Sequence, residues 1–284
     1  KNIPQTKTKV MVNVAIPDSA SEASFLPNQG VGLAREEFII AWKMAMHPMA
    51  LLNVENEKPS VRKAIKEKMR GWEDPEKYFV DNLAFGIAKI GAAFHPHKVI
   101  VRFSDFKTNE YRTLLGGESY EPKEENPMIG WRGASRYYDP KFRPAFLLEA
   151  TAVKKVRQEM GLDNVIPMVP FCRTVDEGIK TQEPMAEVGL FTNYIAHHKP
   201  EAIKGNNPIE TPIYVMCEIP SNVLLADEFL DVFDGMSIGS NDLTQLALGL
   251  DRDSGIVSKV ANENNEAVKK LIAIAIAKCL ERNK

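Results

Sequence analysis

Three stretches of this chain are almost continuously apolar: VIVRF at 99–103, VIPMVPF at 165–171 and YVMCEI at 214–219. A strand with one face in water alternates apolar and polar residues, whereas these runs carry apolar residues at odd and even positions alike. Strands of this kind are covered on both faces, which is typical of a parallel sheet with helices packed against it. The pattern therefore predicts an α/β fold.

Longer helical patterns alternate with the apolar runs, and this alternation implies parallel strands joined by crossover helices. We expect strands at 10–16, 30–38, 98–105, 164–171, 213–221 and 235–242, and helices at about 60–69, 75–93, 144–160, 222–233 and 265–282. A short segment at 130–133, counted as a strand, brings the number of strands to seven. A (β/α)8 barrel takes about 250 residues, so the sequence predicts a TIM-type barrel that lacks its last strand unit. An open doubly wound sheet is the alternative, although no GxGxxG follows a strand.

The domain organisation follows from the same pass along the chain. Residues 10–284 are predicted to form the barrel, and residues 1–9 to be a linker from a preceding domain. The start has no apolar signal core and the end stops on a helix pattern, so we expect a piece of a longer protein. The region at about 180–212 is rich in turn-forming residues and is predicted to be an irregular, exposed insertion.

Composition excludes several classes of partner. The chain has 36 Lys and Arg against 38 Asp and Glu, so it offers no basic field to a nucleic acid. No apolar run approaches ~20 residues, and we expect no membrane partner. The three cysteines, Cys172, Cys217 and Cys279, form no CxxC pair and favour a reduced, cytoplasmic protein. None of the five histidines forms a helical metal pair, and all five are expected in loops or at the surface.

Polar residues stand at the ends of the predicted strands, where the chemistry of a parallel barrel takes place. Several arginines meet two carboxylates there, and arginines bind anions through bidentate contacts. The carboxylates suit a hard divalent cation, most plausibly Mg²⁺. These strand-end residues are Asn13, Arg35, Arg102, Asp105, Arg132, Arg136, Arg173, Glu218, Ser240, Asn241 and Asp242.

Structural interpretations compete with these functional ones. Arg35 is followed by Glu36 and Glu37 and could form a surface ion pair with them. Glu218 could be a buried structural carboxylate paired with an arginine, and Asp242 could cap a helix.

Five long motifs, in order, resemble the C-terminal phosphoenolpyruvate/pyruvate-binding barrel of the phosphoenolpyruvate synthases, within the phosphoenolpyruvate-utilising enzyme family. They are GVGLAREEFI, VIVRFSDFKTNEY, GGESYEPKEENPMIGWRGASRYY, MCEIPSNVLLADEF and MSIGSNDLTQLALGLDRDSG. Pyruvate phosphate dikinase and enzyme I of the sugar phosphotransferase system carry a version of SIGSNDLTQ. The resemblance implies an enzyme that makes phosphoenolpyruvate from ATP, pyruvate and water.

The resemblance also implies the roles of individual residues. Arg35 and Arg102 would contact the substrate, and Arg132 would line the same pocket. Glu218 and Asp242 would bind Mg²⁺. Gly239, Ser240 and Asn241, on the loop between Glu218 and Asp242, would contact the substrate.

Two parts of the family machinery have no match in this chain. The phosphoryl donor is a phosphohistidine on a separate domain, in a TCH-type motif, and ATP binds elsewhere in the full-length protein. A GICGQ segment, whose cysteine handles the methyl proton, follows the final helix in the family. No catalytic residue is therefore expected here, and the fragment alone should be inactive. The alternatives are a non-catalytic scaffolding barrel, a dikinase-like enzyme, or an enolate-binding lyase, and a homo-oligomer is expected from the family.

Overall fold

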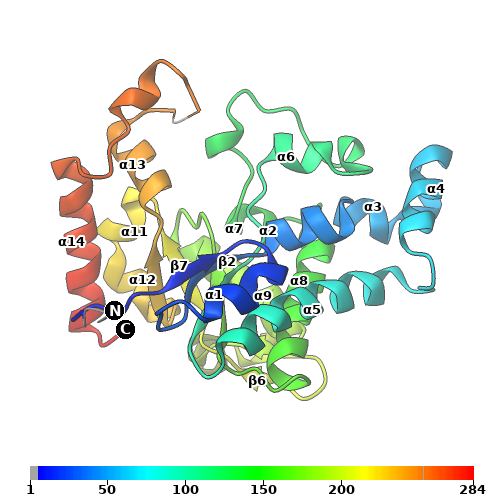
Figure 1. The fold of residues 1–284 in the computed structure, drawn as a ribbon, viewed down its shortest axis with the longest axis horizontal. Helices are drawn as coiled ribbons and strands as arrows, with labels where there is room; N and C mark the ends of the chain where they lie inside the picture. The colour runs from blue at the N-terminus through cyan, green and yellow to red at the C-terminus, as the bar shows by residue number, and fades with distance from the viewer. Residues whose placement is uncertain (1–5, 252) are drawn as a thin grey trace.

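A curled parallel sheet forms the centre of the molecule in the computed structural model, which describes residues 6–251 and 253–284 (Figure 1). Its strands are β1 (Val12–Val14), β2 (Val31–Arg35), β3 (Val99–Arg102), β4 (Val165–Val169), β7 (Tyr214–Cys217) and β8 (Gly235–Ile238). They lie in the order β1-β2-β3-β4-β7-β8, and every neighbouring pair is parallel. The result is a half-barrel, as expected for a TIM-type barrel whose sheet does not close.

Both faces of the central strands are buried, as the apolar runs predicted. Val99 and Val101 of β3 pack into the large outer core against the helices, whereas Ile100 faces inward with Ile166 and Met216. Because side chains alternate along a strand, Arg102 continues the inward row of Ile100, and Glu218 continues that of Met216. The sheet thus delivers both charged residues to the same end of the barrel interior.

Helices cover the outer face of the sheet (Figure 1). The longest, α5 (Pro75–Phe94), packs along α8 (Arg143–Gln158). Asp74 caps α5 by accepting hydrogen bonds from the backbone N–H groups of Glu76 and Lys77, and Pro75 occupies the first turn. The other helices are α1 (Ala20–Ser24), α2 (Glu36–Ile39), α3 (Pro48–Leu52), α4 (Pro59–Lys68), α6 (Thr108–Thr113), α7 (Ala134–Tyr137), α9 (Val175–Glu187), α10 (Asn193–His198), α11 (Pro220–Leu224), α12 (Ala226–Val232), α13 (Ser240–Leu248) and α14 (Glu266–Glu281).

The strand expected at 130–133 does not exist, so the count of seven strands was wrong: the described residues place six in the barrel sheet. Pro127–Ile129 form a 3-10 turn instead. The backbone N–H of Trp131 donates to the Glu124 side chain, and Gly133 has φ 57°, a left-handed conformation that glycine adopts without strain. Local side-chain and turn geometry therefore replaces strand pairing here.

The region at 180–212 is more ordered than expected. Helix α9 continues to Glu187, and β5 (Leu190–Phe191) pairs in parallel with β6 (Ile209–Glu210) in a small second sheet. Met185, Leu190 and Ile195 are fully buried. The prediction of an irregular, exposed excursion was therefore wrong for most of this region, and the turn-rich residues fall mainly between His197 and Pro208.

A long excursion between β3 and α8, residues 103–142, is held by one buried ion-pair network. Arg136 donates to both Glu121 oxygens and to the backbone oxygen of Trp131, and its guanidinium lies against the rings of Trp131, Tyr111 and Phe142. Glu121 also contacts His47 Nε2 at 2.8 Å. His47 lies in the loop before α3, which it caps, but it is fully buried and not at the surface.

Features of the chain outside the barrel were also predicted. Residues 6–9 of the predicted linker are exposed, without helix or strand, and residues 1–5 lie outside the described residues. Cys172 and Cys217 are buried free thiols, and Cys279 is partly exposed. Among the helices that the structure describes, none is long and apolar enough to cross a membrane.

Candidate active site

One cavity of roughly 670 Å³ opens at the carboxyl ends of the barrel strands. The residues that the sequence proposed for the site come from segments up to 207 positions apart. All eight line this cavity: Arg35, Arg102, Arg132, Glu218, Gly239, Ser240, Asn241 and Asp242. Asn13 and Asp105 line it as well, whereas Arg136 and Arg173 do not.

Strand register explains two of these juxtapositions. Arg35 and Arg102 are direct partners across β2 and β3. Cys217 pairs with Ile238 across β7 and β8, so the next residues, Glu218 and Gly239, lie opposite one another. Residues far apart in the chain thus meet because parallel strands end at the same level.

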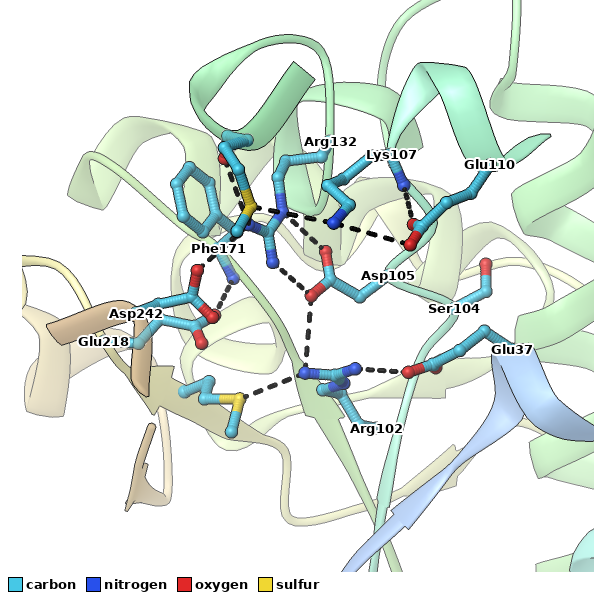
Figure 2. Close-up of polar contacts among 12 residues, drawn as sticks. Glu37, Arg102, Ser104, Asp105, Lys107, Glu110, Arg132, Phe171, Glu218 and Asp242 are labelled. Carbon is cyan, nitrogen blue, oxygen red and sulfur yellow. Dashed lines mark hydrogen bonds and ion pairs between the residues drawn. The ribbon is translucent and has the colours of Figure 1, made fainter. Parts of the chain in front are cut away.

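Arg132 is the centre of a buried charge cluster (Figure 2). It donates to both oxygens of Asp105, with Nε–Oδ1 at 3.0 Å and Nη2–Oδ2 at 2.6 Å, and its Nη1 donates to Asp242 Oδ1 at 3.0 Å. The guanidinium lies 4.2 Å above the Phe171 ring. Burial opposes ionisation of Asp105, but Arg132 and Arg102 lower the pKa of this carboxyl below its usual range.

Arg102 is held from two sides. Its Nη2 donates to Glu37, and its Nη1 lies 3.3 Å from Asp105 Oδ2. Burial would lower the pKa of this guanidinium, but Glu37 and Asp105 raise it. The fork of Arg102 is therefore fixed in place and permanently charged.

Glu218 lies deeper than the other carboxylates and is fully buried. Its Oε1 accepts the backbone N–H of Phe171 at 2.7 Å, whereas its Oε2 has no hydrogen-bond partner. Phe171 adopts φ 44°, which is rare for a residue with a side chain and points to a constrained site. Burial, together with Asp105 and Asp242, raises the pKa of Glu218 to about 8.

The residues fit a divalent cation beside Glu218 and Asp242. The unpartnered Glu218 oxygen is a hard donor, and a Cβ at Gly239 would lie 2.7 Å from it, so only glycine leaves this space open. Four cationic and five anionic side chains line the described cavity, so an anionic ligand needs added positive charge. No group of three or more His, Cys, Asp or Glu suited to a metal exists in the described part of the chain. Two carboxylates suffice for Mg²⁺, which keeps waters and substrate oxygens as its other ligands.

Two cavity residues escaped the assignment of site residues. Asp105 was recognised as a strand-end carboxylate but received no role, and Glu37 was considered only as an alternative, a surface ion-pair partner of Arg35. Glu37 is instead buried and bound to Arg102, and Arg35 forms no ion pair with Glu36 or Glu37 among the described residues. The Arg35 guanidinium lies 4.5 Å from the Phe38 ring. The acidic pair EE after GLAR indicated a carboxylate that binds an arginine. Only the strand register shows which arginine it binds.

One known protein family matches almost the whole chain. Residues 2–284 match the model described as "PEP-utilising enzyme, PEP-binding domain". The chain belongs to this family. Three relatives named phosphoenolpyruvate synthase, from Synechocystis, Escherichia coli and Aeropyrum pernix, are 55%, 51% and 46% identical to it.

These members of the family are much longer than the chain described here. The matches cover 97%, 100% and 97% of this chain, but only 32%, 34% and 30% of the respective relatives. The chain thus corresponds to about a third of each relative, the part that the family model describes as PEP-binding.

Proposed function

We propose that this chain is the barrel of a phosphoenolpyruvate synthase that binds pyruvate or phosphoenolpyruvate together with Mg²⁺. In the whole protein, ATP, pyruvate and water would yield AMP, phosphoenolpyruvate and phosphate. The observation that carries the proposal is the meeting of all eight expected residues around one cavity. A phosphohistidine and an ATP-binding domain elsewhere in the whole protein would supply the phosphoryl group. A cytoplasmic location and a homo-oligomer remain predictions.

The cationic side chains of the cavity would bind the anionic parts of the substrate. Arg35 and Arg102 are strand neighbours and would contact the substrate carboxylate and the incoming phosphoryl oxygens. Arg102 is preorganised by Glu37 and Asp105, so it needs no rearrangement as charge develops. Helix α13 begins at Ser240, and the positive end of its dipole lies at the same cavity.

Glu218 and Asp242 would hold the Mg²⁺ ion, which acts as a Lewis acid toward a keto oxygen when bound. The described cavity lining contains no Cys or His. Cys172 and Cys217 lie elsewhere, and burial raises the pKa of both thiols. No residue of the chain is therefore assigned to the transfer of the methyl proton or to phosphoryl donation.

A calorimetric titration with Mg²⁺ and oxalate, a mimic of the pyruvate enolate, tests the proposal. The parent chain should bind oxalate only with Mg²⁺, and Asp242→Ala should weaken this binding by about tenfold or more. The variant leaves the Asp105 contacts of Arg132 intact, so the arginine keeps its main partner. Asp227→Ala, at an exposed ion pair with Lys278, is the matched control and should bind as the parent does. Equal affinity in Asp242→Ala and the parent contradicts the metal assignment.

A further inference from the structure

A pair of buried carboxyl groups lies directly behind the cavity without lining it. Glu36 on α2 and Glu149 on α8 are both fully buried and in hydrogen-bond contact with each other. Neither forms an ion pair with Lys, Arg or His anywhere in residues 6–251 or 253–284. Two negative charges in contact without a cation are costly in a protein interior, so the pair needs a proton.

The hydrogen bonds around the pair place this proton. Glu149 accepts the backbone N–H of Ser104 at 3.0 Å and the Ser104 hydroxyl at 2.6 Å. Both oxygens of Glu36, in contrast, lack a donor. A contact between two carboxyl groups is a hydrogen bond only if one carries a proton, and Glu149 already serves as the acceptor. The proton therefore belongs on Glu36, which donates it toward Glu149.

Ser104 is fixed at each of its polar atoms. Besides its two bonds to Glu149, its hydroxyl oxygen lies 2.7 Å from the Tyr111 hydroxyl, and its carbonyl accepts from Tyr137 at 2.8 Å. Because the Ser104 proton goes to Glu149, Tyr111 is the donor in the contact between the two hydroxyls. Figure 2 shows Ser104 beside Asp105, on the side away from Glu218 and Asp242.

The pair connects the two acceptors that hold Arg102. Glu37 follows Glu36 in the chain, and Asp105 follows Ser104. Both contact the Arg102 guanidinium, Glu37 at Nη2 and Asp105 at Nη1 (Figure 2). The two carboxylates that contact Arg102 are therefore connected to each other. The connection runs from Glu37 through Glu36, Glu149 and Ser104 to Asp105.

We propose that Glu36 and Glu149 share one proton, carried on Glu36, and that this pair positions Glu37 and Asp105 around Arg102 for anion binding. The role is one of positioning, because neither residue reaches the cavity. This positioning role rests on the proposed function of the cavity. It gives a function to two buried groups that take no part in binding the ligand directly.

The electrostatics of the surroundings agree with this proton position. Burial and the charge of Glu149 raise the pKa of Glu36 well above its usual range. Burial also raises the pKa of Glu149, but hydrogen bonds from Ser104 limit the rise to about 7. The other titratable groups facing the pair are Glu37, which is bound to Arg102, and Tyr111 and Tyr137, whose pKa values are raised so that they stay neutral.

Two isosteric variants distinguish the partners. In Glu36→Gln the amide N–H can donate to Glu149 as the protonated acid does, so Mg²⁺-dependent oxalate binding should stay within about twofold of the parent. In Glu149→Gln only one of the two terminal atoms can accept, so one of the two Ser104 donors faces an N–H₂ group instead of an oxygen, and affinity should fall about tenfold. Glu159→Gln, an exposed site at the end of α8, is the matched control and should match the parent. Equal affinities for the parent and Glu149→Gln, or equal losses in Glu36→Gln and Glu149→Gln, overturn the positioning role.

Infrared spectroscopy detects the protonated carboxyl group itself. A purely structural role of Glu36 predicts no change in this signal. At pH 7 the difference spectrum between the parent and Glu36→Gln should show a carbonyl stretching band of a protonated carboxylic acid, whereas the difference between the parent and Glu159→Gln should show none. If that band is unchanged in Glu36→Gln, the proton assignment is wrong. If Glu149→Gln does not fold, Ser104→Ala replaces it and should weaken oxalate binding about fivefold, with unchanged binding overturning the proposal. A folded parent that binds no oxalate overturns the proposed function instead, and the infrared band separates the two failures.

Discussion

At the scale of single residues, two of the three arginines that line the cavity, Arg102 and Arg132, are already paired with carboxylates before any ligand arrives. Arg102 contacts Glu37 and Asp105, and Arg132 contacts Asp105 and Asp242. These carboxylates orient the guanidinium groups and neutralise part of their charge. An anionic substrate must therefore bind a guanidinium group that already binds a protein carboxylate. This makes the planar shape of arginine as important as its charge.

Arg102→Lys tests this point. Lysine keeps the positive charge but has a single ammonium group, which cannot satisfy Glu37, Asp105 and a ligand in one plane. We expect Mg²⁺-dependent oxalate affinity to fall about tenfold in calorimetry. Arg112→Lys, at an exposed ion pair with Glu118, is the control and should bind like the parent. Undiminished affinity in Arg102→Lys means that the bidentate role is wrong.

At the scale of secondary-structure elements, the excursion at 103–142 carries Asp105 at its start and Arg132 near its end. Its fold depends on the Arg136–Glu121 ion pair, of which both partners are completely buried. Removing one member of a buried pair leaves the other charge in the interior without compensation.

Glu121→Gln should therefore destabilise the protein by about 3–5 kcal/mol, because Arg136 remains buried with a neutral partner. Urea denaturation followed by circular dichroism measures the change in the free energy of unfolding. Glu55→Gln, at an exposed pair with Lys66, should leave the free energy of unfolding almost unchanged. If the two variants lose the same stability, the buried pair does not hold the excursion in place.

The elements differ in how well the sequence predicted them. The central strands were predictable because both of their faces are apolar, and strand ends in a parallel barrel identify where a site forms. The segment at 130–133 was not, because short turns built on Glu124 and Gly133 carry no periodicity. The partners of Glu37 and His47 were not predictable for a related reason: Arg102 and Glu121 are 65 and 74 positions away, and only tertiary packing brings them together.

At the scale of the whole molecule, the buried carboxyl groups link stability to pH. The pKa of Glu149 is raised to about 7 and that of Glu218 to about 8, and burial and the charge of Glu149 raise the pKa of Glu36 well above its usual range. In the unfolded chain these groups titrate near pH 4.5, so the folded state binds more protons above that value. Their stabilising contribution is complete below pH 4.5 and is lost as pH rises through the folded pKa values.

The free energy of unfolding of the metal-free protein should therefore fall between pH 5.5 and 8.5. The fall is about 1.4 kcal/mol per pH unit for each group that is protonated in the folded state and ionised in the unfolded state. Urea midpoints measured at several pH values give the slope. Glu36→Gln removes one titrating group and should flatten the profile. A midpoint that rises with pH throughout this range contradicts the raised pKa values.

The purified 284-residue chain should bind ligand without turnover. The expected anion and metal residues are all present, whereas no residue matches the family's cysteine or phosphohistidine. We expect Mg²⁺-dependent oxalate binding and no phosphoenolpyruvate from ATP and pyruvate in a coupled assay. Genuine synthesis by this chain means that the missing functions were misidentified. A folded chain that binds nothing favours the scaffolding interpretation.

The enclosure of Arg136 has a spectroscopic consequence. Its guanidinium is fully buried, bonded to Glu121 and Trp131, and covered by three aromatic rings. Protons in such a place exchange with water only when the surrounding segment opens. The Arg136 Nε–H should therefore give a slowly exchanging nuclear magnetic resonance signal, shifted by the ring currents of its neighbours. That single resonance would report, without any added label, how often the excursion at 103–142 opens in solution.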